Sequence, residues 1–325
     1  MSGYCFEIFN VYDFLVKTNK ANFLEFIRLE HAQVMAIPLS GTVNHFLKPE
    51  NLWKNRYYDV PCWDHSRVVL SSHGSKAYDY TDSDGKKIIV TSQDSDSTYI
   101  HASFVNGFNE ANKFICCQGP KEGTSGDFWK MVSEHSCRFI VSLTETDGED
   151  QVCYEYWVKE EDYELAFGRY IVRTLEIIEG PSFTRTRLRL TDVSSGTSRE
   201  IYHFWYTRWP DYGTPTNPAE VLNLISQVNQ KREEMRKTDC QPGPIVVHCS
   251  AGVGRTGTFC TIDNALSQLR NRKTVSLSQT VLKIRGRRNS SVFLPEQYEF
   301  CYKTLRHALI REVKEKNILL SDFAT

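Results

Sequence analysis

The chain has 325 residues, of which 40% are hydrophobic and 24% charged, and its formal net charge at pH 7 is −1. This balance predicts a globular protein with a substantial core and argues against a nucleic-acid-binding or membrane-surface protein. No stretch reaches the roughly 18 consecutive apolar residues typical of a membrane-spanning helix, and the first residues lack a signal-peptide pattern. We therefore expect a cytoplasmic protein with no membrane insertion and no nucleic-acid partner.

The ten cysteines form no Cys-x-x-Cys pair and no zinc-ligand spacing. Several stand in apolar runs, as Cys116 and Cys117 do directly after Phe114 and Ile115. Such usage is typical of a reducing compartment and not of a disulfide framework. We expect neither a bound metal nor a cofactor.

Hydrophobic periodicity predicts one mixed α/β domain, because no internal repeat or low-complexity linker interrupts the chain. Residues 1–50 are mainly helical in pattern, with Pro38 closing one helix, and the polar run from Ser71 to Asp96 predicts an exposed loop or hairpin. A short basic cluster at residues 285–288 predicts a solvated face. Strands are expected at 99–105, 113–118, 138–143 and 201–206, with alternating strands up to about 190, and helices at 127–135, 218–237 and 296–316.

One stretch combines a buried strand, a glycine-containing loop and a helix start. Residues 245–247 are β-branched and apolar, and helical spacing begins after Arg255. Backbone N–H groups converge at such a junction and favour phosphate. Cys249 opens the loop, and with Arg255 six residues later its thiol pKa should fall below the ordinary value of about 8.5. A thiolate at the base of a phosphate cradle is a nucleophile directed at phosphorus.

The segment from His248 to Thr256 resembles the signature loop of the cysteine-dependent protein tyrosine phosphatases, and we call it the signature loop. The order and spacing of the other matching motifs resemble the large tyrosine-specific domain and not the short dual-specificity one. Within this family, the short segments at residues 46–51 and 291–297 resemble the corresponding segments of the tyrosine phosphatases that polydnaviruses of parasitoid wasps encode. The matching motifs are Asn55-Arg-Tyr57, Asp64-His-Ser-Arg-Val68, Gln118-Gly-Pro120, Asp127-Phe-Trp129, Tyr156-Trp157, Trp209-Pro-Asp211 and Gln297-Tyr298.

The resemblance implies a highly twisted mixed β-sheet flanked by helices, with the phosphate-binding loop between a central strand and a helix. It implies a catalytic domain at 46–312, an N-terminal helical segment at 1–45 packed on it, and a tail at 313–325. The implied activity is hydrolysis of phosphotyrosine in proteins through a cysteinyl-phosphate intermediate. If the polydnavirus match holds, the targets are host signalling proteins in the cytoplasm of infected insect cells. We expect a monomer.

The resemblance also assigns site residues. Displacing tyrosine from phosphorus leaves a phenolate with a pKa near 10, so a proton donor is needed, and Asp211 on a mobile lid is the expected general acid. Arg255 would hold the phosphoryl oxygens, and Thr256 would offer its hydroxyl to the sulfur. Trp209 would be the packed hinge of the lid and His248 a buttress of the loop. Further implied residues are Tyr57 and Asp59 for the substrate, Gln297 for the water, and Ser250, Ala251, Gly252, Val253 and Gly254 for the phosphate.

Four positions depart from the family pattern. Phe293 stands where a glutamine usually positions water, so Gln297 would have to substitute. Val152 replaces a common lysine, His101 an asparagine, and Asp147 a glutamate that braces the arginine. Because Cys249, Arg255 and Asp211 are all present, we expect an active phosphatase. The alternatives are a phosphotyrosine-binding decoy with slow turnover and, less favoured because of Tyr57 and the lack of extra lysines, a phosphoinositide phosphatase.

Overall fold

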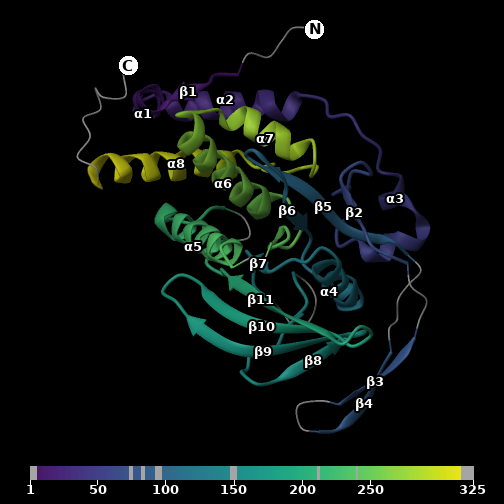
Figure 1. The fold of residues 1–325 in the computed structure, drawn as a ribbon. Helices are drawn as coiled ribbons and strands as arrows, with labels where there is room; N and C mark the ends of the chain where they lie inside the picture. The colour runs from purple at the N-terminus through teal and green to yellow at the C-terminus, as the bar shows by residue number, and fades with distance from the viewer. Residues whose placement is uncertain are drawn as a thin grey trace.

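A large twisted sheet organises the protein in a computed structural model that describes residues 6–72, 76–81, 85–91, 97–146, 152–210, 213–238 and 241–315. Within these residues its strand order is β2-β5-β6-β12-β7-β11-β10-β9-β8 (Figure 1). The central pairs from β6 to β11 are parallel and the outer pairs antiparallel, so the expected mixed sheet is confirmed. The strands are β2 (Arg67–Val69), β5 (Tyr99–Gly107), β6 (Glu110–Cys117), β7 (Phe139–Ser142), β8 (Glu164–Phe167), β9 (Tyr170–Glu179), β10 (Thr184–Asp192), β11 (Thr197–Trp205) and β12 (Ile245–His248).

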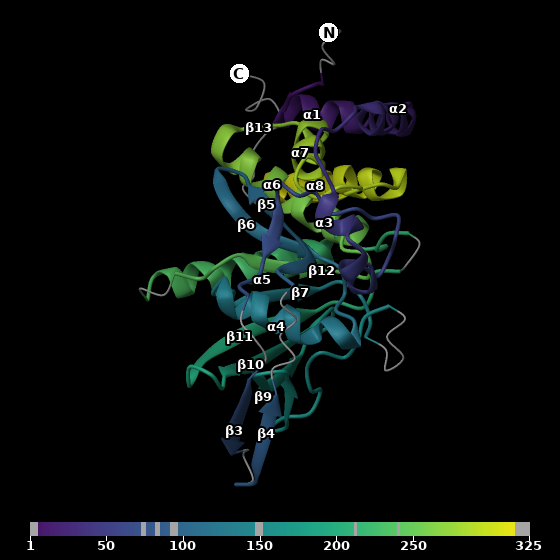
Figure 2. The same ribbon diagram turned by 90° about the vertical axis from the view of Figure 1, so that its right-hand side faces the viewer.

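Helices cover both faces of this sheet. One face carries α5 to α8 together with the N-terminal α1 and α2, and the other carries α4 (Figures 1 and 2). The helical segments are α1 (Val11–Thr18), α2 (Phe23–Ala36), α3 (Asn44–Leu47), η1 (Pro49–Lys54), η2 (Glu122–Thr124), α4 (Ser125–Glu134), α5 (Pro218–Arg236), α6 (Gly254–Arg272), α7 (Leu277–Arg285) and α8 (Pro295–Glu315).

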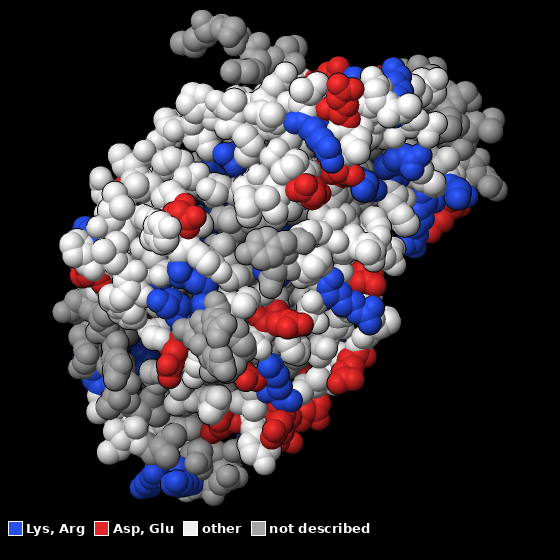
Figure 3. All heavy atoms as spheres, turned by 180° about the vertical axis from the view of Figure 1, so that it is seen from behind, with Lys and Arg blue, Asp and Glu red and all other residues white. Residues whose placement is uncertain are grey.

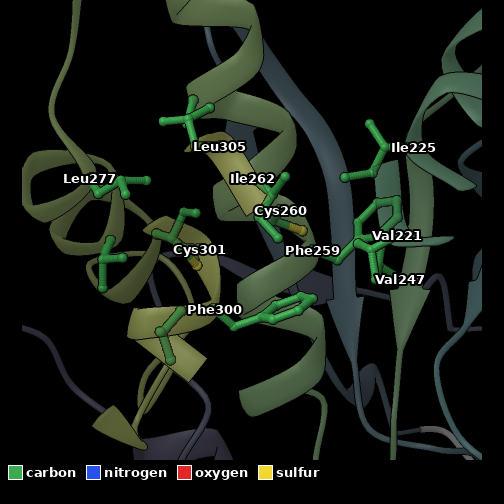
Figure 4. Packing of buried hydrophobic residues seen from close by; sticks show 14 of the residues in the cluster. Val221, Ile225, Val247, Phe259, Cys260, Ile262, Leu277, Phe300, Cys301 and Leu305 are labelled. Atoms are coloured by element: carbon green, nitrogen blue, oxygen red, sulfur yellow. The ribbon is translucent and has the colours of Figure 1, made fainter. Parts of the chain in front are cut away.

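Strand β12 lies between the two hydrophobic cores. Ile245 and Val247 point into the core shared with α5, α6 and α8, and Val246 points into the core shared with α4. Successive side chains of a strand alternate between faces, so an unbroken β-branched run is what a strand buried on both sides requires. Helix α6 packs between α5 on one side and α7 and α8 on the other. Figure 4 shows this packing through Val221 and Ile225 of α5, Phe259 and Ile262 of α6, Leu277 of α7, and Phe300 and Leu305 of α8, together with Val247 of β12.

Two small sheets lie outside the main one. Strand β1 (Phe9–Asn10) pairs with β13 (Thr274–Val275) and ties the start of the described chain to the end of α6. Strands β3 (Ala77–Thr81) and β4 (Lys87–Thr91) form a hairpin that extends away from the body (Figure 2). The polar run was therefore correctly expected to hold a hairpin, although residues 73–75, 82–84 and 92–96 lie outside the description.

The N-terminal helices pack on the rest of the protein. Phe14 of α1 stacks on Tyr302 of α8 with ring centroids 5.6 Å apart, and the buried Ile27 and Val34 of α2 join the same core. The division of the chain at residues 45 and 312 stays a prediction. On the surface opposite the view of Figure 1, acidic and basic side chains are interspersed, as the near-zero net charge suggests (Figure 3).

Candidate active site

The signature loop lies between the central strand β12 and the start of α6. Gly252 has a φ of 70°, and a Cβ there would collide with the carbonyl oxygen of Cys117, so the turn requires glycine. Residues just after the neighbouring strands β6 and β7 hold the loop through backbone hydrogen bonds: the Gly119 N–H donates to the Ser250 carbonyl at 2.8 Å, and the Leu143 N–H donates to the His248 carbonyl at 2.9 Å.

Two donors point at the sulfur of Cys249. The Gly252 N–H and the Thr256 hydroxyl each donate to Sγ at 3.3 Å. Burial raises the pKa of the thiol, but the positive charge of Arg255 and these donors outweigh it, so the net pKa of Cys249 is lowered. The sequence predicted this lowering of the Cys249 pKa. Other buried thiols, such as Cys137 and Cys301, have raised pKa values because burial dominates there.

Arg255 is buried at the start of α6, and its Nη1 donates to the carbonyl oxygen of Trp209 at 3.3 Å. Trp209 is packed between Tyr206 and Phe300, and its Nε1 donates to the carbonyl oxygen of Gly213 at 3.3 Å. The two ends of the expected lid are therefore tied to each other and to the signature loop. Asp211 itself lies outside the described residues, as does Asp147.

His248 faces away from the loop interior. Its Nε2 lies 2.6 Å from the hydroxyl of Tyr156, which also lies 2.8 Å from Nε2 of His203. Burial, together with the nearby positive charges of Arg56 and Arg255, lowers the pKa of His248 to about 4, so the ring is neutral at pH 7. Tyr156 was predicted only as part of a motif and His203 was not predicted, because no local pattern indicates that these three side chains meet.

Tyr57 stands at the mouth of the site. It is 36% exposed, and its hydroxyl lies 2.7 Å from Oγ of Ser250. Arg56 places it by donating to the carbonyls of Gly119 and Pro120, at 3.2 and 2.8 Å. Two matching motifs that are distant in sequence therefore form one contact. The next residues, Tyr58 and Asp59, are exposed at the surface.

Phe293 and Gln297 lie against the start of α6. A Cβ at Gly254 would collide with the Gln297 amide nitrogen and would come within 3.0 Å of the Phe293 ring. The side-chain Oε1 of Gln297 accepts a hydrogen bond from the Leu294 N–H at 3.3 Å, whereas the Phe293 ring is 47% exposed. Both side chains therefore reach the edge of the signature loop, and Gln297 is the one with a polar group there.

Arg288 was missed, and the expectation of a solvated basic face was wrong for it. Its side chain is completely buried and donates to the carbonyls of Ala251 and Gly252, each at 3.1 Å. Arg285 of the same cluster is also buried. Holding two loop carbonyls outward turns the amide edge of the loop inward, as an anion cradle needs. Arg288, in the basic cluster at residues 285–288, is 36 residues from Gly252 in sequence, so no local pattern indicates this role.

His101 completes the contact of Arg288. Its Nδ1 accepts from Arg288 Nη2 at 3.0 Å, and its Nε2 donates to the carbonyl oxygen of Val60 at 2.7 Å. Burial and the neighbouring Arg288 charge lower the pKa of His101 to about 3, so the ring stays neutral. The histidine that replaces the usual asparagine therefore connects Val60, close to Tyr57 in sequence, to Arg288 and through it to the signature loop. In the described part of the chain, no group of acidic, histidine or cysteine side chains could hold a metal ion.

Comparison with known proteins agrees with this geometry. Residues 51–307 match the family model described as protein-tyrosine phosphatase. The chain is 84% identical over 317 residues to tyrosine phosphatase H3 of Microplitis demolitor bracovirus, covering 97% of this chain and 99% of that protein. It is 49% identical over 311 residues to tyrosine phosphatase-like protein H1 of the same virus, covering 95% and 88%.

A mammalian relative is more distant. Tyrosine-protein phosphatase non-receptor type 9 of Mus musculus is 37% identical over 280 residues, which cover 84% of this chain and 44% of that protein. The chain therefore belongs to the protein-tyrosine phosphatase family. The expected enzyme class and the expected similarity to polydnavirus phosphatases are confirmed. No described helix is both long and apolar enough to cross a membrane.

Proposed function

We propose that this protein hydrolyses phosphotyrosine in proteins through a cysteinyl-phosphate intermediate. The observation that carries the proposal is the sulfur of Cys249, which accepts from the Gly252 N–H and the Thr256 hydroxyl beside the Arg255 charge. Donors directed at a buried sulfur stabilise its thiolate, which is the form that attacks phosphorus.

In the first step the Cys249 thiolate attacks phosphorus and the bond to the tyrosine oxygen breaks. Asp211 donates its proton to that oxygen, so the leaving group departs as a neutral phenol. The Arg255 guanidinium holds two phosphoryl oxygens as charge spreads over them, and the inward N–H groups of residues 250–254 hold the third. Arg288 supports this arrangement because it binds the outward carbonyls of Ala251 and Gly252.

In the second step water attacks the phosphocysteine and the sulfur–phosphorus bond breaks. The Asp211 carboxylate accepts a proton from the water, and the Thr256 hydroxyl stabilises the thiolate that leaves. Gln297 is the residue proposed to orient the water, since its amide lies beside Gly254 at the edge of the loop. His248 stays neutral and acts only as a support.

The substrate class follows from the mouth of the site. Tyr57 forms a wall whose hydroxyl reaches Ser250, which suits a planar phosphorylated ring that extends far enough to bring its phosphate to the sulfur. A phosphoserine side chain is shorter and would leave its phosphate out of reach. Asp59 is exposed beside this wall and is proposed to accept backbone N–H groups of the substrate peptide.

The test is turnover of a phosphotyrosine peptide by the purified protein, beside the same peptide with phosphoserine and a soluble phosphoinositide. We expect phosphate release from the phosphotyrosine peptide only. Comparable release from phosphoserine would contradict the proposed wall, and preference for the phosphoinositide would assign the protein to the alternative lipid-directed class.

The viral relatives suggest where this activity would act. If the similarity to the bracovirus proteins reflects a shared origin, we propose that the substrates are signalling proteins in the cytoplasm of infected insect cells. A monomer suffices for this function, because every proposed catalytic group comes from one chain.

A second candidate function is capture of phosphotyrosine proteins with slow turnover, and Phe293 is the observation that favours it. Its ring occupies the edge of the signature loop, where a phenyl group cannot orient water. Formation of phosphocysteine would then proceed while its hydrolysis lags, and the protein would hold its target longer than a fast phosphatase does.

Phe293→Gln should raise kcat about tenfold, which is roughly 1.4 kcal/mol of barrier. The added amide can orient water for the slow second step. Rapid-mixing assays with an aryl phosphate should show a burst of phenol release in the parent and a smaller burst in the variant. Phe293→Leu, which adds no polar group, is the matched control and should keep the parental burst. Single-phase kinetics in the parent with no gain from glutamine would contradict the slow-hydrolysis proposal.

A further inference from the structure

Val292 has a backbone conformation that a valine rarely adopts. Its φ is 55°, in the left-handed region, and its side chain is completely buried. A β-branched residue is strained there, so such a conformation persists only where surrounding contacts impose it. The residue directly precedes Phe293 and lies five positions before Gln297.

Two hydrogen bonds impose this conformation. The Val292 N–H donates to the carbonyl oxygen of Val253 in the signature loop at 3.2 Å. The Val292 carbonyl accepts from Nε2 of His31, at 3.0 Å, and because a carbonyl can only accept, this nitrogen carries the proton. One strained residue thus links the N-terminal helix α2 to the loop that holds Cys249.

The side chain of His31 is buried in the interior. It is 5% exposed, and its ring lies 5.4 Å from that of Tyr298, one residue after Gln297. Helix α2 lies beside α7 and α8 (Figure 2), where Glu30 accepts hydrogen bonds from the hydroxyls of Tyr298 and Tyr302 at 2.7 and 2.6 Å. The Glu30 contacts fasten the helix, whereas the His31 contact reaches the segment before Gln297.

The segment from Arg285 to Gln297 connects the end of α7 to α8. Side chains from residues 63–65 donate hydrogen bonds to backbone carbonyls at the start of this segment. Trp63 Nε1 donates to the Arg285 carbonyl at 3.1 Å, and His65 Nε2 donates to the Gly286 carbonyl at 2.8 Å. At the other end of the segment, next to Phe293, Arg285 Nη1 donates to the Ser291 carbonyl at 3.2 Å, and His31 Nε2 donates to the Val292 carbonyl at 3.0 Å. The His31 contact is the one of these two that comes from the N-terminal helix α2.

We infer that His31 is a positioning residue for hydrolysis of the phosphocysteine, acting through the Val292 backbone on Gln297 and Phe293. The inference rests on the proposed two-step function. Attack by Cys249 does not need the water-orienting group, so loss of the His31 donor should slow only the second step.

The test is His31→Phe, which keeps a ring against Tyr298 but lacks the N–H donor. With an aryl phosphate, we expect kcat per active site to fall about tenfold, which is less than the roughly 100-fold loss that a full 1 Å misplacement of a reacting group can cause. KM should fall in parallel, leaving kcat/KM unchanged, because kcat/KM reports the steps up to phosphocysteine formation. More of the enzyme should be trapped as phosphocysteine after acid quenching. His31→Gln, whose amide can donate, should restore much of the rate.

Tyr302→Phe is the matched control, because it removes a bond from the same helix contact without touching Val292. We expect a lower Tm and parental kinetics. Rates are normalised to the folded fraction measured by circular dichroism so that unfolded protein does not contribute, and His31→Leu serves if the phenylalanine variant does not fold.

The inference would be overturned if the His31 variants hydrolysed phosphocysteine at the parental rate, or if Tyr302→Phe also lowered kcat and KM in parallel. Either result would leave the proposed function intact. Absence of phosphocysteine and of phosphate release in the parent and all variants would instead reject the proposed function.

Discussion

Cys249→Ser should reduce turnover of a phosphotyrosine peptide to background while the peptide still binds. A serine hydroxyl has no accessible anion at neutral pH, so the nucleophile is lost. The Gly252 N–H, the Arg255 charge and the carbonyl contacts of Arg288 do not depend on the sulfur, so the phosphate cradle remains. Phosphate release and peptide binding by calorimetry measure the two properties separately.

Cys137→Ala is the control for this result. Cys137 is a buried thiol between α4 and β7, outside the signature loop, and burial raises its pKa to about 12. We expect nearly parental activity per folded molecule. Residual turnover near the parental level in Cys249→Ser would reject the nucleophile assignment.

Asp211→Ala should lower kcat on a phosphotyrosine peptide by roughly 10²-fold or more, the loss expected for a missing general acid. The loss should be much smaller for an aryl phosphate whose leaving group is already acidic, because that group needs no proton. Since the acid must be protonated to act, kcat/KM should fall as pH rises through its pKa, and the variant should lose that falling limb.

Asp211→Asn distinguishes loss of the proton donor from loss of the side-chain shape. The amide keeps the shape of the side chain but cannot supply the proton, so we expect the same dependence on leaving group as in the alanine variant. Equal losses on both substrates would indicate instead that Asp211 shapes the lid whose ends, Trp209 and Gly213, are joined by a hydrogen bond.

Local sequence was enough to locate the proposed nucleophile. The β-branched run, the glycine at the left-handed turn, Cys249 and Arg255 occupy one continuous stretch, and a strand, loop and helix start position them through backbone geometry alone. Hydrophobic periodicity likewise indicated a mixed α/β domain, and the family resemblance carried by the ordered motifs implied its mixed sheet. The lowered pKa of Cys249 follows from groups within seven residues of it.

Only the tertiary structure decided which distant side chains support that stretch. Arg288 reaches Gly252 across 36 residues, Tyr156 reaches His248 across 92, and His31 reaches Val292 across 261. Sequence patterns report local periodicity and exposure, so a basic cluster was assigned to a solvated face, and the helical pattern of residues 1–50 gave no sign of the His31 contact. Folding buries these polar groups, and a buried polar group must find a partner wherever the chain brings one. The position of the proposed nucleophile was therefore determined by the sequence, whereas its supporting contacts were determined by the fold.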